Sequence, residues 1–365
     1  MKSFAQLGLL PSLLGTLKKK GLTQPTEIQI ETVPKLLSGT SIVGISRTGT
    51  GKTLAYVLPI LHRLKSMEYE GNGVTKPASP RALVITPTRE LAEQVTRVFK
   101  QYTHQTRIRV RSVMGGTTAE VSKNNLTGPF DVMVATPTRL LKLLDKKLVS
   151  LSDVQILILD EADQMLDPGF LGTVKRISKE CHADVQRGLF SATISSNVQT
   201  LINEYFPTTE KAAPKTGTPF SPTLKTKEVF VENGHRFPFL EAELKKKVEG
   251  STLIFVNTRE QCDELAKQLK TSGHKCVVCR GEMERLERRA NLKAFREGKV
   301  SLMVSTDLAA RGLDVDGVYR VINYHLPRTK DNYVHRVGRT ARAGKQGLVV
   351  NLVTRRDQRL EYSMS

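Results

Sequence analysis

The stretch from Ile42 to Thr53 reads Ile-Val-Gly-Ile-Ser-Arg-Thr-Gly-Thr-Gly-Lys-Thr, and an apolar helical pattern follows it directly. A buried strand, a glycine-rich turn and a helix start gather backbone N–H groups and the positive end of a helix dipole around a polyphosphate. Lys52 is then placed to reach the outer phosphates, and the Thr53 hydroxyl to ligate Mg²⁺. Ser46 stands where the common pattern has glycine. Taken alone, the stretch is also compatible with an ordinary turn between a strand and a helix.

Other short apolar runs alternate with helical segments along the chain. Ala82–Ile85, Val132–Val134 and Ile156–Leu159 are apolar at every position, which is typical of parallel strands buried on both faces. Helical segments such as Glu90–Tyr102 lie between them. The first part of the chain is therefore predicted to be a doubly wound α/β domain.

Four prolines interrupt this pattern between residues 207 and 226, which predicts a flexible linker. A second alternation follows, with apolar runs such as Leu253–Val256, Leu302–Val304 and Leu348–Val350. The sequence thus predicts two tandem α/β domains with doubly wound parallel sheets. Their predicted bounds are 1–206 and 227–365, with the linker over 207–226.

Composition excludes several classes of protein. The 365 residues suit two domains, and 39% hydrophobic with 25% charged residues argues against a disordered chain. No apolar run approaches the roughly 20 residues of a membrane helix. The stretch Leu7–Leu17 has its lysines behind it, unlike a secretory signal. Four cysteines do not make a disulfide framework, and Cys276 and Cys279 would point to opposite faces of a strand, so buried reduced thiols are expected.

The charge balance points to a polyanionic partner. Lys plus Arg number 56 and Asp plus Glu 36, which gives a formal net charge of +20. Such an excess raises the expectation of nucleic-acid binding. A solvated basic surface without that function is compatible with the charge alone.

The apolar run Ile156–Leu159 ends in Asp160-Glu161-Ala162-Asp163. A carboxylate at the end of a buried parallel strand beside a phosphate loop is where a nucleotide's Mg²⁺ is held, so Asp160 is expected to hold Mg²⁺ through a water. Glu161 is placed to orient or deprotonate an attacking water. Together with the phosphate loop, this pair predicts a nucleoside-triphosphatase site, whereas a solvated acidic turn is the alternative.

These motifs resemble those of the DEAD-box ATP-dependent RNA helicases, members of helicase superfamily two with two RecA-like lobes. The resemblance runs from about Phe4 to about Leu352, with the motifs in the family's order and spacing. It implies two tandem RecA-like domains and ATP with Mg²⁺ as cofactors. The catalytic residues that it implies are Lys52, Asp160, Glu161, Arg339 and Arg342.

The resemblance also implies an adenine site near the N-terminus. Pro25–Gln29 resembles the Q motif, whose glutamine reads the adenine edge while an upstream aromatic, here Phe4, packs nearby. Leu22 stands where the family usually has Phe or Tyr, so we expect lower affinity for ATP. The implied ATP contacts are Phe4, Leu22, Gln29, Ser46, Arg47, Thr48, Gly49, Thr50, Gly51, Lys52, Thr53 and, at the ribose, Asp314.

RNA contacts are implied at several strand ends, where hydroxyls, arginines and glycine N–H groups can bind phosphates without reading bases. Taken singly, each segment is more often a simple turn. Thr138 and Arg285 depart from the Gly and Gln that the family usually has. The implied contacts are Thr88, Arg89, Gly115, Gly116, Thr136, Arg139, Asn257, Arg288 and Thr306.

Two further motifs are implied to couple ATP to RNA. Ser191 and Thr193 lie two residues apart at a strand end, so both hydroxyls are expected to meet Asp163. His335 is the fourth coupling residue and opens the motif His335–Arg342.

The motif His335–Arg342 matches the family's arginine fingers. Arg339 and Arg342 would share one helix face and converge on the γ-phosphate. Ala341 stands where glycine is usual, a small change that we expect to be tolerated. A solvated basic helix is the alternative interpretation.

The sequence therefore predicts an RNA helicase that hydrolyses ATP on binding RNA and unwinds short duplexes or remodels RNA–protein complexes. An ATP-gated RNA clamp with little unwinding activity, and a translocating DNA helicase of the same superfamily, are the alternatives. The expected partner is single-stranded or short duplex RNA without sequence preference, in ribosomal or RNA-turnover complexes. We also expect a monomeric core that works in the cytoplasm, without a membrane.

Overall fold

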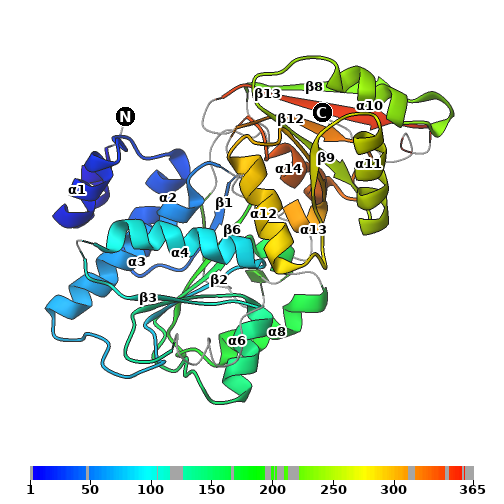
Figure 1. Cartoon of the computed structure of the whole chain (residues 1–365). Helices are drawn as coiled ribbons and strands as arrows, with labels where there is room; N and C mark the ends of the chain where they lie inside the picture. Colours follow the sequence, from blue (N-terminus) through cyan, green and yellow to red (C-terminus); the bar gives the residue numbers. More distant parts are fainter. Residues whose placement is uncertain are drawn as a thin grey trace. The chain divides into compact units, whose positions relative to one another are not determined.

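The computed structural model divides into two compact units, Met1–Gly217 and Thr218–Ser365, each built around one parallel sheet (Figure 1). It describes residues 3–46, 49–104, 106–115, 126–165, 168–193, 199–200, 202–203, 209–212, 222–310, 317–341, 345–355 and 357. Within these residues, no helix is both long and apolar enough to cross a membrane. The predicted α/β class with two parallel-sheet domains is confirmed.

The first unit has a seven-stranded sheet of order β3-β4-β2-β5-β6-β1-β7, in which every neighbouring pair is parallel. Its strands are β1 (Ile42–Ile45), β2 (Ala82–Ile85), β3 (Val110–Val113), β4 (Val132–Ala135), β5 (Ile156–Asp160), β6 (Gln186–Ser191) and β7 (Glu210–Ala212). Its helices are η1 (Phe4–Leu7), α1 (Pro11–Lys19), α2 (Glu27–Leu37), α3 (Lys52–Tyr69), α4 (Arg89–Thr103), α6 (Pro137–Asp145), α7 (Ala162–Met165) and α8 (Pro168–Lys179).

Alternate residues of the central strands feed two separate cores. On β2, Ala82 and Val84 pack with α1 to α4, while Leu83 and Ile85 pack with α6 to α8 on the other face. All four β2 residues are fully buried. Because both faces are covered, a central strand is apolar throughout, as its sequence predicted.

The second unit has a six-stranded sheet of order β10-β11-β9-β12-β13-β8, again parallel throughout. Its strands are β8 (Leu224–Phe230), β9 (Ser251–Val256), β10 (Cys276–Cys279), β11 (Leu302–Thr306), β12 (Val318–Asn323) and β13 (Gly347–Val353). Its helices are η2 (Glu232–Gly234), α10 (Phe237–Leu244), α11 (Arg259–Thr271), α12 (Arg285–Arg296), α13 (Asp307–Ala310) and α14 (Lys330–Val337).

The CxxC pair behaves as its sequence predicted. Cys276 packs in the core under α10 and α11, and Cys279 packs in the core under α12 and α14, on the opposite face of the sheet. All four cysteines lie among the described residues, and none of them forms a disulfide. Burial raises the pKa of the Cys276 thiol, which favours the protonated form.

The segment predicted as the linker, residues 207–226, contributes to both sheets. β7 pairs with β1, and β8 begins inside the segment and pairs with β13 over its whole length. Most β8 residues are exposed, since the strand lies at a sheet edge and carries lysines there. Such edge strands do not show up as apolar runs, because an edge strand has a neighbouring strand on one side only and its side chains are more exposed.

Candidate functional site

The carboxyl edge of the first unit's sheet carries two groups of predicted site residues. β1, β5 and β6 are neighbours in this sheet, so the phosphate loop after β1 lies next to the residues that end β5 and β6. β2, β4 and β3 continue the sheet beyond β5, and predicted RNA contacts follow each of them. The two predicted sites therefore lie side by side along one edge, where parallel sheets bind ligands.

The phosphate loop is held by its own side chains. Lys52, 8% exposed, donates a hydrogen bond to the backbone oxygen of Ser46, and Ser46 Oγ lies 2.6 Å from Thr50 Oγ1. The Ser46 backbone N–H donates to Ser191 O at 3.0 Å, which ties the loop to the end of β6. Gly51 has φ +91°, a conformation that favours glycine, at the entry to α3. Ser46 thus uses its hydroxyl inside the loop, and Arg47 and Thr48 lie outside the described residues.

Gln29 connects α2 to the phosphate loop. Its Oε1 accepts from the Thr26 backbone N–H, and its Nε2 donates to Gly51 O, both at 3.0 Å. A side chain at Gly51 would collide with this carboxamide. Among the described residues these bonds occupy one N–H and one lone pair, and the amide has a second of each for an adenine edge. Phe4 is buried in the core, while Leu22 is 37% exposed.

Two acidic residues lie buried where β5 ends. Asp160 and Glu161 are 3% and 7% exposed. The Tyr56 hydroxyl donates to Asp160 Oδ2 at 2.7 Å, and the Glu161 backbone N–H donates to Oδ1 at 3.0 Å. Burial and the neighbouring Glu161 carboxylate raise the pKa of Asp160 to about 6, against the opposing effect of Lys52. This edge of the sheet therefore holds more negative charge than its neighbours neutralise.

The residues present fit a magnesium site. Two adjacent buried carboxyl groups, of which Asp160 has a raised pKa, favour a divalent cation, and Mg²⁺ prefers oxygen ligands. Asp160 and Thr53, in the first turn of α3, are the residues that would hold the ion. When bound, Mg²⁺ neutralises charge on the nucleotide phosphates. Gln164 Nε2 donates to Glu161 Oε2, so the second carboxylate is held by the chain itself.

The predicted coupling residues meet only in part. Thr193 Oγ1 donates to Asp163 Oδ2 at 3.3 Å, as predicted. The Ser191 hydroxyl instead donates to Thr193 O at 2.7 Å. The chain bends directly after Ser191, so the alternation of an extended strand no longer applies and the two hydroxyls do not share one target.

The predicted RNA contacts of the first unit gather after β2, β3 and β4. Thr88 caps α4 by accepting from the Leu91 backbone N–H, and Arg89 Nη1 donates to Gly115 O at 3.2 Å. Thr136 is the residue before α6, whose first turn contains Arg139. Strand ends, a helix cap and an arginine are thus brought together, whereas Gly116 lies outside the described residues.

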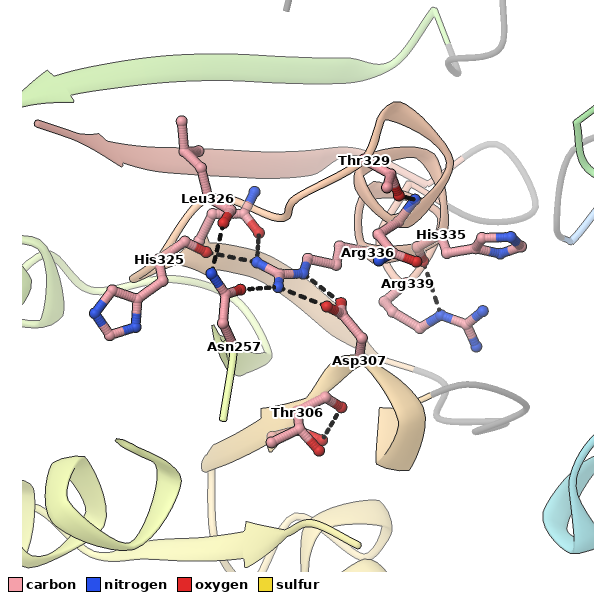
Figure 2. A network of polar contacts seen from close by, with 12 residues as sticks. Asn257, Thr306, Asp307, His325, Leu326, Thr329, His335, Arg336 and Arg339 are labelled. Carbon is pink, nitrogen blue, oxygen red and sulfur yellow. Dashed lines mark hydrogen bonds and ion pairs between the residues drawn. The ribbon is translucent and has the colours of Figure 1, made fainter. Parts of the chain in front are cut away.

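In the second unit, α14 joins three neighbouring strand ends through Arg336 (Figure 2). Arg336 Nε and Nη2 donate to the Asp307 carboxylate at 2.5 and 2.8 Å, and Nη2 also donates to Asn257 Oδ1 at 2.7 Å. Nη1 donates to Asn323 Oδ1 and to His325 O. Of the predicted RNA contacts, Asn257 is therefore bonded to this arginine, and Thr306 is the residue before Asp307, which is bonded to it as well.

Arg339 lies beside this network. It is 5% exposed, and its Nε donates to His335 O at 3.1 Å. Both residues line a small open pocket with Phe255, Asp307, Ala310 and Arg336. Arg288, on α12, donates from Nη2 to Ala309 O at 3.2 Å. Asp314 and Arg342 lie outside the described residues.

Comparisons with known proteins decide the family. The family described as DEAD/DEAH box helicase matches residues 26–201, and the helicase conserved C-terminal domain matches residues 235–344. The DEAD-box ATP-dependent RNA helicase RhpA of Helicobacter pylori is 36% identical over 356 residues, which cover 96% of this chain and 70% of RhpA. The chain belongs to the DEAD-box ATP-dependent RNA helicase family. Among its other relatives, this DEAD-box protein is 36% identical to the RNA helicase CrhR of Synechocystis, over 99% of this chain and 72% of CrhR.

A solved DEAD-box structure has the same fold. Dbp5 of Saccharomyces cerevisiae, bound to RNA and ADP BeF3, matches with a TM-score of 0.86 and 31% identity. The match covers 97% of this chain and 90% of that one. The two RecA-like domains expected of a DEAD-box protein are therefore confirmed.

Two residues of this DEAD-box protein were missed by sequence reasoning. Tyr56 lies one turn after Lys52 on α3, where the pattern indicates only an apolar core position, yet its hydroxyl bonds Asp160. Burial and the Asp160 carboxylate raise the pKa of Tyr56 well above its usual range, so it remains a donor. Arg336 sits within the arginine motif but was given no role. A polar atom on an otherwise apolar helix face was the available signal for Tyr56.

Proposed function

We propose that this DEAD-box protein hydrolyses ATP when RNA is bound and uses the cycle to separate short RNA duplexes or remodel RNA–protein complexes. The observation behind the proposal is that the carboxyl edge of the first unit's sheet carries both predicted sites, one beside the other. The phosphate loop follows β1 and the Asp160–Glu161 pair lies where β5 ends, while predicted RNA contacts follow β2, β4 and β3. ATP and RNA would therefore contact adjoining strands of one rigid sheet.

Each side chain in the proposed site has a chemical role. Lys52 would leave the Ser46 carbonyl and bind the outer phosphates, and Glu161, oriented by Gln164, would position the attacking water. Arg339, with Arg342, would supply positive charge to the transferred phosphoryl group. Asp163 and Thr193, which are hydrogen-bonded to each other, would couple the binding and hydrolysis of ATP to the RNA-binding strands.

RNA-dependent hydrolysis follows if the arginines reach the phosphates only in an RNA-bound state. RNA that binds this state better raises its population and so activates hydrolysis. By reciprocity, ATP must then tighten RNA binding. Contacts to phosphates and 2′-hydroxyls would favour RNA over DNA with little sequence preference. RhpA and CrhR are named RNA helicases, and Dbp5 was solved with RNA, which supports the same partner here.

Measuring ATP hydrolysis with single-stranded RNA and with DNA of the same sequence tests the proposal. We expect stimulation by RNA alone. Equal stimulation by both would favour a translocating DNA helicase, and no stimulation by either would refute the proposal.

An ATP-gated RNA clamp is the second candidate, because it needs the same residues. Strand displacement of a short RNA duplex, measured beside the dissociation rate of RNA held with an ATP analogue, separates the two. Rapid displacement supports the helicase, whereas slow dissociation without displacement supports the clamp. We further propose a cytoplasmic, monomeric enzyme acting on ribosomal or RNA-turnover complexes, and cellular crosslinking would test that assignment.

A further inference from the structure

Arg336 is the most completely bonded side chain of the second unit's strand-end network. Only 1% of it is exposed. Its five N–H donors make five hydrogen bonds, to the side chains of Asp307, Asn257 and Asn323 and to His325 O (Figure 2). The guanidinium also lies over the Phe255 ring, 5.0 Å from its centroid. Such an arginine has no N–H donor left for a phosphate.

The partners of Arg336 share one position in the fold. Asn257 follows β9, Asp307 follows β11, and Asn323 ends β12, and these three strands are neighbours in the sheet. A second layer extends the network: Asn323 Nδ2 donates to Asn351 Oδ1 at 2.8 Å, and Asn351 Nδ2 donates to the Tyr333 hydroxyl at 3.0 Å. Tyr333 lies on α14 and Asn351 lies on β13, so the network includes both elements. One helix is thus fixed to four strands.

The network also joins two predicted functions. Asn257 and Thr306, the residue before Asp307, are the predicted RNA contacts. Arg339, the predicted phosphate contact, lies just beyond the end of α14 and donates to the backbone oxygen of His335 on that helix. Any shift of the strand ends relative to α14 would have to break bonds to a buried guanidinium. Breaking some of the bonds in a buried polar network is unfavourable. A displacement of the strand ends should therefore move α14 with them rather than break the network.

We propose that Arg336 is a positioning residue that couples RNA contact at the β9 and β11 ends to the placement of Arg339, an inference that rests on the proposed function. RNA bound at Asn257 and Thr306 would favour one position of those strand ends. Through Asp307 and Arg336, the same position would be imposed on α14 and so on Arg339. Arg336 itself touches neither RNA nor ATP.

Arg336→Lys in the full chain tests the proposal, because lysine keeps the charge but cannot span four separate partners. Two quantities are measured: the factor by which a non-hydrolysable ATP analogue tightens RNA binding, and kcat with saturating RNA. We expect both to fall by about tenfold or more, within the usual range of coupling between sites. Binding of the analogue without RNA should stay as in the wild type.

Arg320→Lys is the matched control. Arg320 is 3% exposed and braces the same strand, β12, nearer its other end, where it donates to Thr252 Oγ1, Glu243 O and Lys246 O. The control should lower the Tm as Arg336→Lys does, yet leave the coupling factor and kcat unchanged. Equal losses in both variants would show a merely structural role and overturn the proposal.

A milder variant serves if Arg336→Lys does not fold. Asp307→Asn keeps the shape of a side chain that is 22% exposed, and should reduce the coupling factor in the same direction by less. Where both variants fold, the double variant should lose no more than Arg336→Lys alone, because both substitutions disrupt the same ion pair. Full coupling in Asp307→Asn, or loss of analogue binding without RNA in Arg336→Lys, would overturn the proposal. A wild-type chain without RNA-stimulated ATPase would instead refute the proposed function itself.

Discussion

Both units have buried charged residues at the carboxyl ends of a parallel sheet, but the charge is neutralised by neighbouring side chains in only one of them. In the first unit, Asp160 and Glu161 lie side by side, and burial with mutual repulsion raises the pKa of Asp160 to about 6. In the second unit, the Asp307 carboxylate and the Arg336 guanidinium form an ion pair with every N–H of the arginine bonded. One cluster has an excess of charge, and the other is neutralised.

The difference indicates what each cluster does. A carboxylate pair that its own protein does not neutralise is suited to binding a cation from outside, as a ligand site would be. A neutralised and fully bonded pair has no hydrogen-bonding group left for a ligand. Its effect is therefore on the shape of the unit. Buried charge alone therefore does not identify a catalytic residue. The number of hydrogen-bonding groups that remain for a ligand separates the two cases.

The largest expected effect separates Arg339 from Arg336. Arg339→Ala should lower kcat for RNA-stimulated hydrolysis by about 10³-fold or more, since an arginine finger contributes about 10³–10⁵ in rate. Stopped-flow binding of a fluorescent ATP analogue should still give an affinity close to that of the wild type. A collapse of nucleotide affinity would show that Arg339 binds the ground state, and the contrast between the two arginines would then be lost.

Glu161→Gln should lower kcat by about 10²–10⁴-fold, the usual contribution of a general base. Because glutamine keeps the shape and can still bond Gln164, ATP should still tighten RNA binding in this variant. Fluorescence anisotropy of labelled RNA with ATP measures this directly. Near wild-type turnover would remove the proposed role of Glu161. Gln164→Leu is a useful companion, because it releases the carboxylate without removing it and should reduce turnover less.

How far the sequence predicts the molecule depends on how local each signal is. Central strands such as β2 are apolar at every position because both faces are covered, so their place was predictable. The edge strands β7 and β8 were not, because Lys225 and Lys227 on β8 resemble linker residues. The phosphate loop and the Asp160 pair are each contiguous in sequence, and both were predicted at strand ends.

Contacts between distant residues were beyond the sequence. Tyr56 and Asp160 are 104 positions apart, and no local pattern says that the phenol meets the carboxylate. Arg336, Arg339 and Arg342 belong to one basic segment, in which nothing in the spacing indicates that Arg336 is turned into the core. The set of hydrogen-bond partners, which only the fold determines, distinguishes Arg336, because all five of its N–H donors are bonded inside the unit.

The charge contrast predicts opposite responses to pH without metal. Asp160 has a folded pKa of about 6, above its unfolded value of 3.8, so its destabilising effect is complete above pH 6 and disappears as the pH falls toward 4. His325 in the second unit has a pKa lowered by burial to about 4, so its contribution to stability is complete above pH 6.5 and is lost as the pH falls toward 4.

Asp160→Asn should therefore raise the Tm in EDTA at pH 7, and raise it less at pH 5. Differential scanning calorimetry of both proteins at the two pH values measures the difference. Asp145→Asn removes an exposed carboxylate, 45% accessible, from the same unit and serves as the control. A gain from Asp160→Asn that is equal at both pH values would mean that Asp160 is not destabilised by its buried charge.

The smallest expected effect concerns backbone strain, which is present at one residue near each cluster. Glu161 has φ +52° and Ala341 has φ +54°, and both conformations favour glycine. A left-handed residue costs about 1–2 kcal/mol, part of which glycine returns as entropy of the unfolded chain. Ala341→Gly should thus stabilise the second unit by up to about 1 kcal/mol, or about 2–4 °C in Tm, with ATPase unchanged. Glu161→Gly should relieve similar strain in the first unit but lose the ATPase, because there the strained residue also carries the carboxylate. A lower Tm for Ala341→Gly would show that the left-handed conformation at this position is held without strain.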